Sequence, residues 1–379
     1  MKLELKDFYN LVNRSGSIFN GHIAVMPNKF FVPKELFSVS VYGDNHSFVG
    51  LNSFSMLTGS AINFNKDLAV RAAFGEVLER YCAQIPKKPL YYGSFNEFKN
   101  KFNIIEPSLF NFIKDEYYHT DEIYLKKPSK DTDMFWVDAK DYISNEKKLI
   151  PEQVASFGNH SNDRYFTSTS TGMAAGSTFE NAVKSGLLEC LERHAFSQFW
   201  YFQSNIKLKK HNSEAILEKF GDDNQIQILY KNNRIKTTVY DLTEFTYVPT
   251  YLVFYEYKYK GKNEFSVGCA SRFSQKDALL KAGLEAYQGI GYGSMLLEKF
   301  KDIKKPLSKM NLKSVLSDFN RHYWYYHAYP NERKGVVIFD ELKLTNGFSK
   351  LKDYSKNPIK DVDSFIKNTN LNNFFVVDL

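Results

Sequence analysis

One pattern of small and acidic residues occurs three times along this chain at identical spacing. It opens with a glycine, continues with two small residues, and ends with a glutamate followed one helical turn later by a glutamate or a glutamine. The copies are Gly59, Ala69, Ala73, Glu76, Glu79; Gly172, Ala182, Gly186, Glu189, Glu192; and Gly268, Ala278, Ala282, Glu285, Gln288. A repeat of this kind indicates that one supersecondary unit is reused, so we expect three equivalent units in the fold.

Each copy predicts a strand, a tight turn at the glycine and a helix. The runs 164–171 and 262–267 before the second and third glycines contain β-favouring residues. A preferred N-cap residue and then a first-turn acid follow each glycine. These pairs are Asn65 with Asp67, Thr178 with Glu180, and Ser274 with Asp277. The second small residue of each copy lies one helical turn before the first glutamate, where it permits close approach of either the helix or a ligand.

The repeat predicts an α/β or α+β fold with mixed sheets and three equivalent helices. The units cover about residues 50–81, 164–196 and 262–292, and the stretches 84–135 and 205–235 are interpreted as insertions between them. No linker rich in Pro, Gly or Ser divides the chain. Residues 1–379 are therefore predicted to form a single domain.

Composition excludes several classes of protein. The net charge of +7 is spread along the chain, and no recognised nucleic-acid motif occurs, so we expect no nucleic-acid partner. No apolar run is long enough to span a membrane, and the N-terminus lacks the apolar region of a signal peptide. These features predict a cytoplasmic protein. The 3 cysteines are far apart and the 8 histidines lack metal-ligand spacing, which argues against disulfides and a transition-metal site.

The repeated glutamates are the strongest candidates for chemistry. Glu76 with Glu79, and Glu189 with Glu192, have the i,i+3 spacing that puts two side chains on one face of a helix. The segments around them are otherwise apolar or small, which is a poor environment for a solvated charge. Four carboxylates from two helices would suit Mg²⁺, which takes oxygen ligands and bridges substrate phosphates.

A structural interpretation of the same motif is open. Arg80 and Arg193 each follow the second glutamate directly and would be its ion-pair partner in a core. The repetition of the motif favours the metal site over this alternative. The third copy supplies Glu285 and the neutral Gln288, whose amide would hydrogen-bond a nucleotide where a third charged pair would be excessive.

A hydroxyl-rich run, Ser168 to Thr171, leads into the second glycine. Contact with phosphate and an exposed strand edge are equally compatible with this composition. Neither a Walker motif nor a dinucleotide-binding glycine signature is present.

Three blocks of the sequence resemble the YcaO family. Residues 67–81 (DLAVRAAFGEVLERY) are similar to its first helix pattern. Residues 170–196 resemble a longer block in which a glycine turn precedes a second ExxER helix, and this is the most specific of the three. Residues 239–257 followed by 266–288 resemble the third block. The resemblance covers about residues 50–300 in order.

This resemblance implies a YcaO-like fold whose repeated helices bind ATP and Mg²⁺. It assigns no catalytic residue. The Mg²⁺ ligands it implies are Glu76, Glu79, Glu189 and Glu192. The nucleotide-binding residues it implies are Ser185, Glu189, Glu192, Arg193, Glu285 and Gln288.

The resemblance also implies an activity. Many YcaO enzymes are cyclodehydratases that form thiazoline or oxazoline rings from Cys, Ser or Thr of ribosomal precursor peptides, as in bacteriocin biosynthesis. We therefore expect an ATP-dependent cyclodehydratase subunit. Two alternatives stay open: an enzyme that forms thioamides or amidines, and a catalytically silent scaffold that binds a peptide.

The expected partners follow from the same resemblance. They are the precursor peptide, a separate ThiF-like leader-recognition protein, a flavin dehydrogenase as a further candidate, and a second copy of the chain in a homodimer. No leader-recognition domain is expected within the 379 residues.

Three departures from the family pattern bear on azoline formation more than on ATP binding. Ile290 stands where the family often has Arg, and the first turn reads Gly59-Ser60-Ala61 rather than GxG. Azoline-forming members often end in a proline-rich tail after a V-V-D-L-T strand, whereas this chain stops at Val377–Leu379. We expect either an incomplete C-terminus, or a tail whose role is supplied elsewhere or dispensed with.

Overall fold

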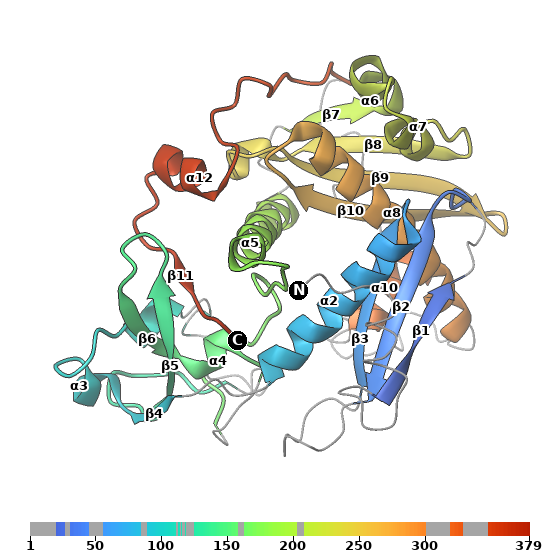
Figure 1. The fold of residues 1–379 in the computed structure, drawn as a ribbon. Helices are drawn as coiled ribbons and strands as arrows, with labels where there is room; N and C mark the ends of the chain where they lie inside the picture. The colour runs from blue at the N-terminus through green and yellow to red at the C-terminus, as the bar shows by residue number, and fades with distance from the viewer. Residues whose placement is uncertain are drawn as a thin grey trace.

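The computed structural model consists mainly of three antiparallel sheets and three long helices (Figure 1). It describes residues 20–26, 31–44, 56–84, 89–110, 113, 115, 118, 125–157, 163–202, 208–300, 319–328 and 348–379. Every pair of described strands is antiparallel. The α+β alternative is therefore confirmed, and the expectation of mixed sheets is wrong for the described strands.

The first sheet has the order β1-β2-β3 and is covered by helix α2. Its elements are β1 (Asn20–Met26), β2 (Phe37–Asp44), β3 (Met56–Asn63) and α2 (Lys66–Gln84). Apolar side chains of β2 and β3 pack against Val70, Phe74 and Val77 on one face of α2. This packing fixes which face of α2 is left for its glutamates.

The second sheet has the order β10-β9-β8-β7 and has helices on both faces. Its strands are β7 (Lys209–Asn212), β8 (Ile235–Asp241), β9 (Thr250–Tyr259) and β10 (Lys262–Ser271). Successive side chains of β9 point to opposite faces of the sheet and so contribute to two separate hydrophobic cores. Tyr251, Val253 and Tyr255 join the core of α6, α7 and α8, whereas Leu252 and Phe254 pack with α5.

These helices are α5 (Phe179–Phe202), α6 (Ser213–Phe220), α7 (Asn224–Tyr230) and α8 (Gln275–Lys299). Helix α10 (Phe319–Ala328) packs beside the C-terminal half of α8, and the 3-10 helix η5 is Thr243–Phe245. No helix of the described residues is long and apolar enough to cross a membrane.

The third sheet is built around β5 (Met134–Asp141). It contains β4 (Leu90–Gly93), β6 (Lys147–Pro151) and β11 (Phe375–Val376), with the short helices α3 (Phe95–Phe98), α4 (Glu152–Ala155) and η2 (Pro107–Phe110) nearby. Helix α12 (Val362–Thr369) packs on the N-terminal half of α5. In Figure 1, α5 lies at the centre with this sheet on one side and the other two sheets beyond it.

The predicted helix starts are confirmed in all three units. The side chain of Asn65 accepts hydrogen bonds from the amides of Asp67 and Leu68 ahead of α2. Thr178 caps α5 by accepting from the amide of Asn181 at 3.2 Å. Ser274 caps α8 by accepting from the amide of Asp277 at 3.4 Å. Local capping chemistry therefore defines the N-terminus of each repeated helix.

The predicted turn at each glycine is correct only in the second unit. There Gly172 has a φ of +85°, which favours glycine. Gly59 and Gly268 lie inside β3 and β10 instead. A Cβ at these positions would come within 2.0 Å of the Ala73 oxygen and 2.1 Å of the Ala282 oxygen, respectively. The repeated small residues thus let α2 and α8 lie directly on β3 and β10.

The strand predicted over residues 164–171 is absent from the second unit, where the chain is irregular. The reason is a competing hydrogen-bond acceptor. Gln153 Oε1 accepts from the amides of Tyr165 at 2.8 Å and Phe166 at 3.3 Å. A side chain therefore satisfies donors that a neighbouring strand would otherwise take. The single-domain organisation, the unit boundaries and the two insertions stay predictions.

Candidate active site

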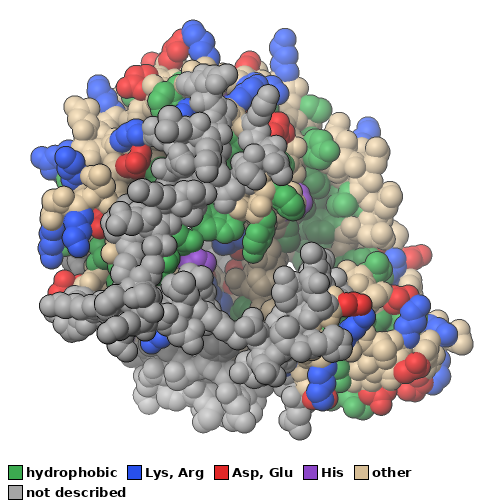
Figure 2. All heavy atoms as spheres, turned by 180° about the vertical axis from the view of Figure 1, so that it is seen from behind, with side chains coloured by type: hydrophobic (Ala, Val, Ile, Leu, Met, Phe, Trp, Pro, Cys, Tyr) green, Lys and Arg blue, Asp and Glu red, His purple; other side chains and the backbone are tan. Residues whose placement is uncertain are grey.

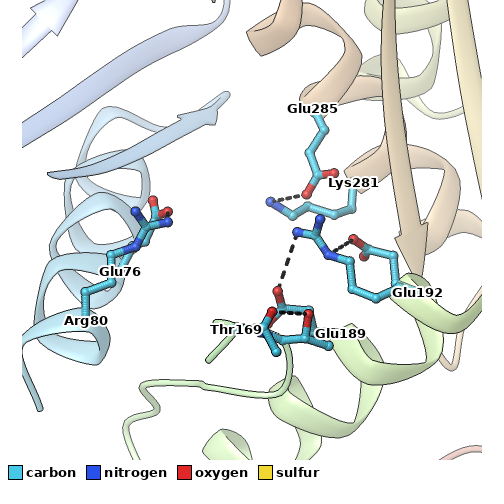
Figure 3. Close-up of polar contacts among 9 residues, drawn as sticks. Glu76, Arg80, Thr169, Glu189, Glu192, Lys281 and Glu285 are labelled. Atoms are coloured by element: carbon cyan, nitrogen blue, oxygen red, sulfur yellow. Dashed lines mark hydrogen bonds and ion pairs between the residues drawn. The ribbon is translucent and has the colours of Figure 1, made fainter. Parts of the chain in front are cut away.

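The acidic side chains of all three repeated helices lie around one region. Figure 3 shows Glu189 and Glu192 on α5 and Glu285 on α8 pointing toward one another, with Glu76 of α2 on the opposite side. Glu189 is close enough to Glu79 for its charge to raise the pKa of Glu79. The structure therefore brings together the five carboxylates that the sequence singled out.

Backbone amides beside the repeated glycines hold two of these carboxylates. The Ser60 N–H donates to Glu76 Oε2 at 2.7 Å. In the second unit, the backbone of Gly172 hydrogen-bonds to the Glu189 carboxylate. The equivalent glutamate is thus held by backbone at the repeated glycine in two units, although the donor differs by one position.

The first glutamate of each unit also has a cation one helical turn away. Arg80 Nη2 pairs with Glu76 Oε1. Arg193 Nη2 lies 3.5 Å from Glu189 Oε1, and Lys281 Nζ lies 3.1 Å from Glu285 Oε1. These pairs are partly exposed, and i,i+4 spacing accounts for each of them.

The expectation that each arginine would pair with the second glutamate is wrong for Arg80. Its ion-pair partner is Glu76, because a residue four positions back shares its helix face. Arg193 contacts both acids of its motif, since its Nε also lies 3.9 Å from Glu192 Oε1. Both pairs line the carboxylate region rather than a closed core, because both arginine side chains keep substantial exposure.

Burial and mutual repulsion disfavour the charged form of these carboxyls. Burial first, and then the charges of Glu189 and Glu76, raise the pKa of Glu79 to about 8 against the opposing effect of Arg80. Burial also raises the pKa of Glu189, although Arg193 opposes this. The carboxylates are therefore incompletely neutralised by the protein itself.

Glu192 is the most buried acid of the cluster. Its pKa is raised by burial and then by the charge of Glu285, against the opposing effects of Arg193, Arg272 and Lys281. A carboxylate in this position gains from any additional cation.

The donor atoms of this cluster suit Mg²⁺, although their positions do not form a ready-made metal site. Among the described residues, no three His, Cys, Asp or Glu side chains lie close enough to hold a metal ion as they stand. The donors are carboxylate oxygens, which Mg²⁺ prefers, and their raised pKa values show that positive charge would be favourable there. Glu76, Glu79, Glu189 and Glu192 are the residues placed to contribute.

The other predicted nucleotide contacts border the cluster. Ser185 is exposed on α5, one turn before Glu189, and Gln288 is half-buried on α8, one turn after Glu285. Gln288 makes no side-chain hydrogen bond to any residue that the structure describes. In the hydroxyl-rich run, Thr169 and Thr171 hydrogen-bond to each other at 3.1 Å (Figure 3). Gly172, which follows this run directly, hydrogen-bonds through its backbone to the Glu189 carboxylate, so the run leads into the carboxylate cluster.

Sequence reasoning missed three features of this region. Lys281 was visible in principle, since it precedes Glu285 by one helical turn. Arg272 directly follows β10, and its charge lowers the pKa of Glu192 through space, so no local sequence pattern predicts this effect. Ser60 donates to Glu76 through its backbone N–H, a group that nearly every residue type has, so the residue type does not indicate this contact.

A cavity of about 350 Å³ adjoins the cluster along the C-terminal half of α2. Arg80 belongs to both, because its guanidinium pairs with Glu76 and also lines the cavity. The molecule is visibly hollowed between its lobes when seen from behind, where basic, acidic and apolar side chains show within the hollow (Figure 2). The carboxylate region therefore has room beside it for a second ligand.

The fold is that of the YcaO heterocyclases, as comparison with solved structures shows. A heterocyclase in complex with substrate and cofactor is similar over 98% of this chain and 49% of its own length, with a TM-score of 0.65 and 16% identity. A chain of the E. coli microcin synthetase McbBCD complex is similar over 94% of this chain and 83% of its own, with a TM-score of 0.56 and 15% identity. The heterocyclase TruD matches 63% of this chain and 36% of its own, with a TM-score of 0.51 and 20% identity.

The chain belongs to the YcaO family. Residues 63–379 match the family model described as YcaO cyclodehydratase, ATP- and Mg²⁺-binding. ATP and Mg²⁺, which the sequence predicted, are thus confirmed as the ligands of this family. The chain spans about half the length of the heterocyclase that it matches over 98% of its residues. No curated protein matches its sequence.

Proposed function

We propose that this chain is an ATP- and Mg²⁺-dependent cyclodehydratase subunit that forms thiazoline or oxazoline rings in a ribosomal precursor peptide. The observation that carries the proposal is the convergence of five carboxylates from three repeated helices, each first glutamate having a cation partner on its own helix. A triphosphate with divalent cations requires this combination of acids and bases in one place.

In the proposed reaction, the side-chain thiol or hydroxyl of Cys, Ser or Thr gives up its proton to solvent and adds to the carbon of the preceding amide, and the C=O π electrons move to the oxygen. The resulting oxyanion attacks the γ-phosphorus of ATP, and the electron pair of the broken P–O bond stays with ADP. The amide nitrogen then forms a C=N bond and loses its proton, while the C–O bond breaks and phosphate departs with its electron pair. Each ring thus consumes one ATP, and the peptide loses the elements of water.

The residues have distinct proposed roles. Glu76, Glu79, Glu189 and Glu192 would hold Mg²⁺, which neutralises the triphosphate charge when bound. The nucleotide itself would contact Ser185, Glu189, Glu192, Arg193, Glu285 and Gln288. The residues that the chain supplies are thus concerned with positioning and charge neutralisation, the main requirements of phosphoryl transfer.

We also propose that a separate ThiF-like protein delivers the precursor peptide. The similar microcin synthetase chain comes from a multi-protein complex, for which a structure with pro-MccB17 bound also exists. This supports a role in bacteriocin-type biosynthesis. A flavin dehydrogenase partner, a homodimer and a cytoplasmic location stay predictions.

Mass spectrometry of the product tests the reaction class. The protein would be incubated with ATP, Mg²⁺, a candidate precursor peptide and its delivery protein. Ring formation removes one water mass per site and releases one ADP and one phosphate, whereas thioamide formation replaces oxygen by sulfur. Glu192→Gln should abolish turnover, while Lys350→Gln, at an exposed ion pair, should not. Full activity of Glu192→Gln in the assembled complex would contradict the proposed site and favour the scaffold alternative.

A further inference from the structure

The cavity beside α2 is formed by residues from segments far apart in the sequence. It lies between the C-terminal half of α2, the start of β3 and the irregular segment 164–170. The lining residues are Leu57, Thr58, Arg80, Gln84, Leu125, Phe157, Arg164, Phe166, Thr167, Ser168 and Ser170. The hydroxyl-rich run that the sequence left unexplained thus forms one of its walls.

The charge of this lining is of one sign. Two guanidinium groups, those of Arg80 and Arg164, face the cavity with four hydroxyl side chains. No Asp or Glu is among its described lining residues. The neighbouring helix faces are acidic, so positive charge is concentrated at this one place beside the carboxylates. A cavity with two arginines, hydroxyls and no acid suits an oxyanion.

Both guanidinium groups have donors to spare. Within the described part of the chain, the Arg164 side chain makes no hydrogen bond or ion pair, and it is exposed. Arg80 uses Nη2 for Glu76, but its Nε is buried without a hydrogen-bond partner among the described atoms. A buried donor left in this state costs free energy unless a ligand supplies the acceptor.

The rest of the lining is apolar. Leu57, Leu125, Phe157 and Phe166 contribute hydrocarbon surface, and a volume of about 350 Å³ exceeds what a lone inorganic anion fills. A ligand that matches both the basic and the apolar lining is an anionic group attached to an organic chain. Under the proposed function, one such species arises next to the carboxylate cluster, namely the peptide with its phosphorylated amide oxygen.

We propose that this cavity is a phosphate site separate from the nucleotide site, and that it holds the phosphoryl group after its transfer to the peptide. The inference rests on the proposed function. Arg80 joins the two sites, since it pairs with Glu76 of the carboxylate cluster and lines the cavity. When the C–O bond breaks, the electron pair stays on the phosphate oxygens, and Arg80 and Arg164 stabilise that charge.

Calorimetric titration with inorganic phosphate alone tests the cavity without any turnover. Phosphate should bind the wild-type protein, and Arg164→Gln should weaken binding about tenfold or more through the loss of a charge-assisted contact. Arg164→Lys should restore part of the affinity, because it keeps the charge but not the planar donor pair. Lys130→Gln is the matched control, since Lys130 is paired with Glu106 away from the lining.

A second titration identifies the source of the phosphate. With a non-hydrolysable ATP analogue and Mg²⁺ at saturation, inorganic phosphate should bind as before. Competition between the two would show that the cavity holds the γ-phosphate of the nucleotide, which overturns a separate site. Absence of phosphate binding, or equal binding by Arg164→Gln, would also overturn it. Failure of the analogue to bind while phosphate still binds would count against the proposed function and leave the phosphate site standing.

Discussion

Gly59 of β3 lies directly against the backbone of Ala73 in α2, so closely that a Cβ at Gly59 would come within 2.0 Å of the Ala73 oxygen. The same relationship recurs between Gly268 and Ala282 at 2.1 Å. The small residues of the repeat are therefore required for close packing, which sets the distance from β3 and β10 to the glutamates of α2 and α8.

We predict that Gly268→Ala lowers the free energy of unfolding by about 2 kcal/mol or more, because backbone must shift to admit the methyl group. Urea unfolding followed by circular dichroism measures the change. Gly291→Ala is the control. Gly291 lies on α8, the helix that packs against Gly268, but a Cβ at Gly291 meets nothing within 4 Å, so the better helix propensity of Ala should stabilise by roughly 0.5–1 kcal/mol. Unchanged stability of Gly268→Ala would contradict the packing account.

Glu79 predicts a pH dependence of stability in the absence of metal. Its pKa is raised to about 8 in the folded protein, whereas the unfolded carboxyl titrates near 4.5. The folded state therefore binds the extra proton between these values, and Glu79 makes the free energy of unfolding fall as pH rises through this window.

Glu79→Gln should flatten this dependence and stabilise the metal-free protein at pH 8, by no more than about 1–2 kcal/mol given partial solvent screening. Thermal unfolding from pH 5 to 9 checks it. Glu97→Gln, at an exposed ion pair, should leave the pH profile as it is. A profile of Glu79→Gln that matches the wild type would show that Glu79 ionises normally.

We expect a larger stability effect at a buried histidine–glutamate pair away from the site. His327 Nδ1 of α10 lies 2.6 Å from Glu264 Oε2 of β10, and both side chains are almost fully buried. His327→Leu leaves the carboxylate buried without this partner, which should cost about 3–5 kcal/mol. Glu218→Gln, at a pair exposed on both sides, should change stability by less than about 0.5 kcal/mol. Chemical denaturation of both variants distinguishes the two cases.

The parts of the fold that depend on local chemistry could be predicted from the sequence. Asn65, Thr178 and Ser274 cap their helices as expected, because an N-cap needs only its own side chain and the next turn of backbone. The absence of a strand over residues 164–171 could not be predicted from local sequence. Backbone donors within this run are taken by Gln153, which comes from another segment.

The candidate site, like the fold, could be predicted where it depends on local spacing and could not where it depends on distant segments. The spacing of the glutamates placed them on one face of each helix, and the structure brings those faces together. The roles of Arg272 and Arg164 depend on which distant segments meet in space, and the sequence holds no local sign of either. The role of Lys281 lay within reach, because its pairing with Glu285 is an ordinary i,i+4 contact.

The central claim is that the repeated helices form one Mg²⁺-dependent nucleotide site. Calorimetric titration of the protein with a non-hydrolysable ATP analogue, with and without Mg²⁺, tests it most directly. We predict binding that requires Mg²⁺ and is lost in Glu76→Gln and in Glu189→Gln, with both variants still folded. Binding that is independent of Mg²⁺, or that survives both substitutions, would contradict the claim.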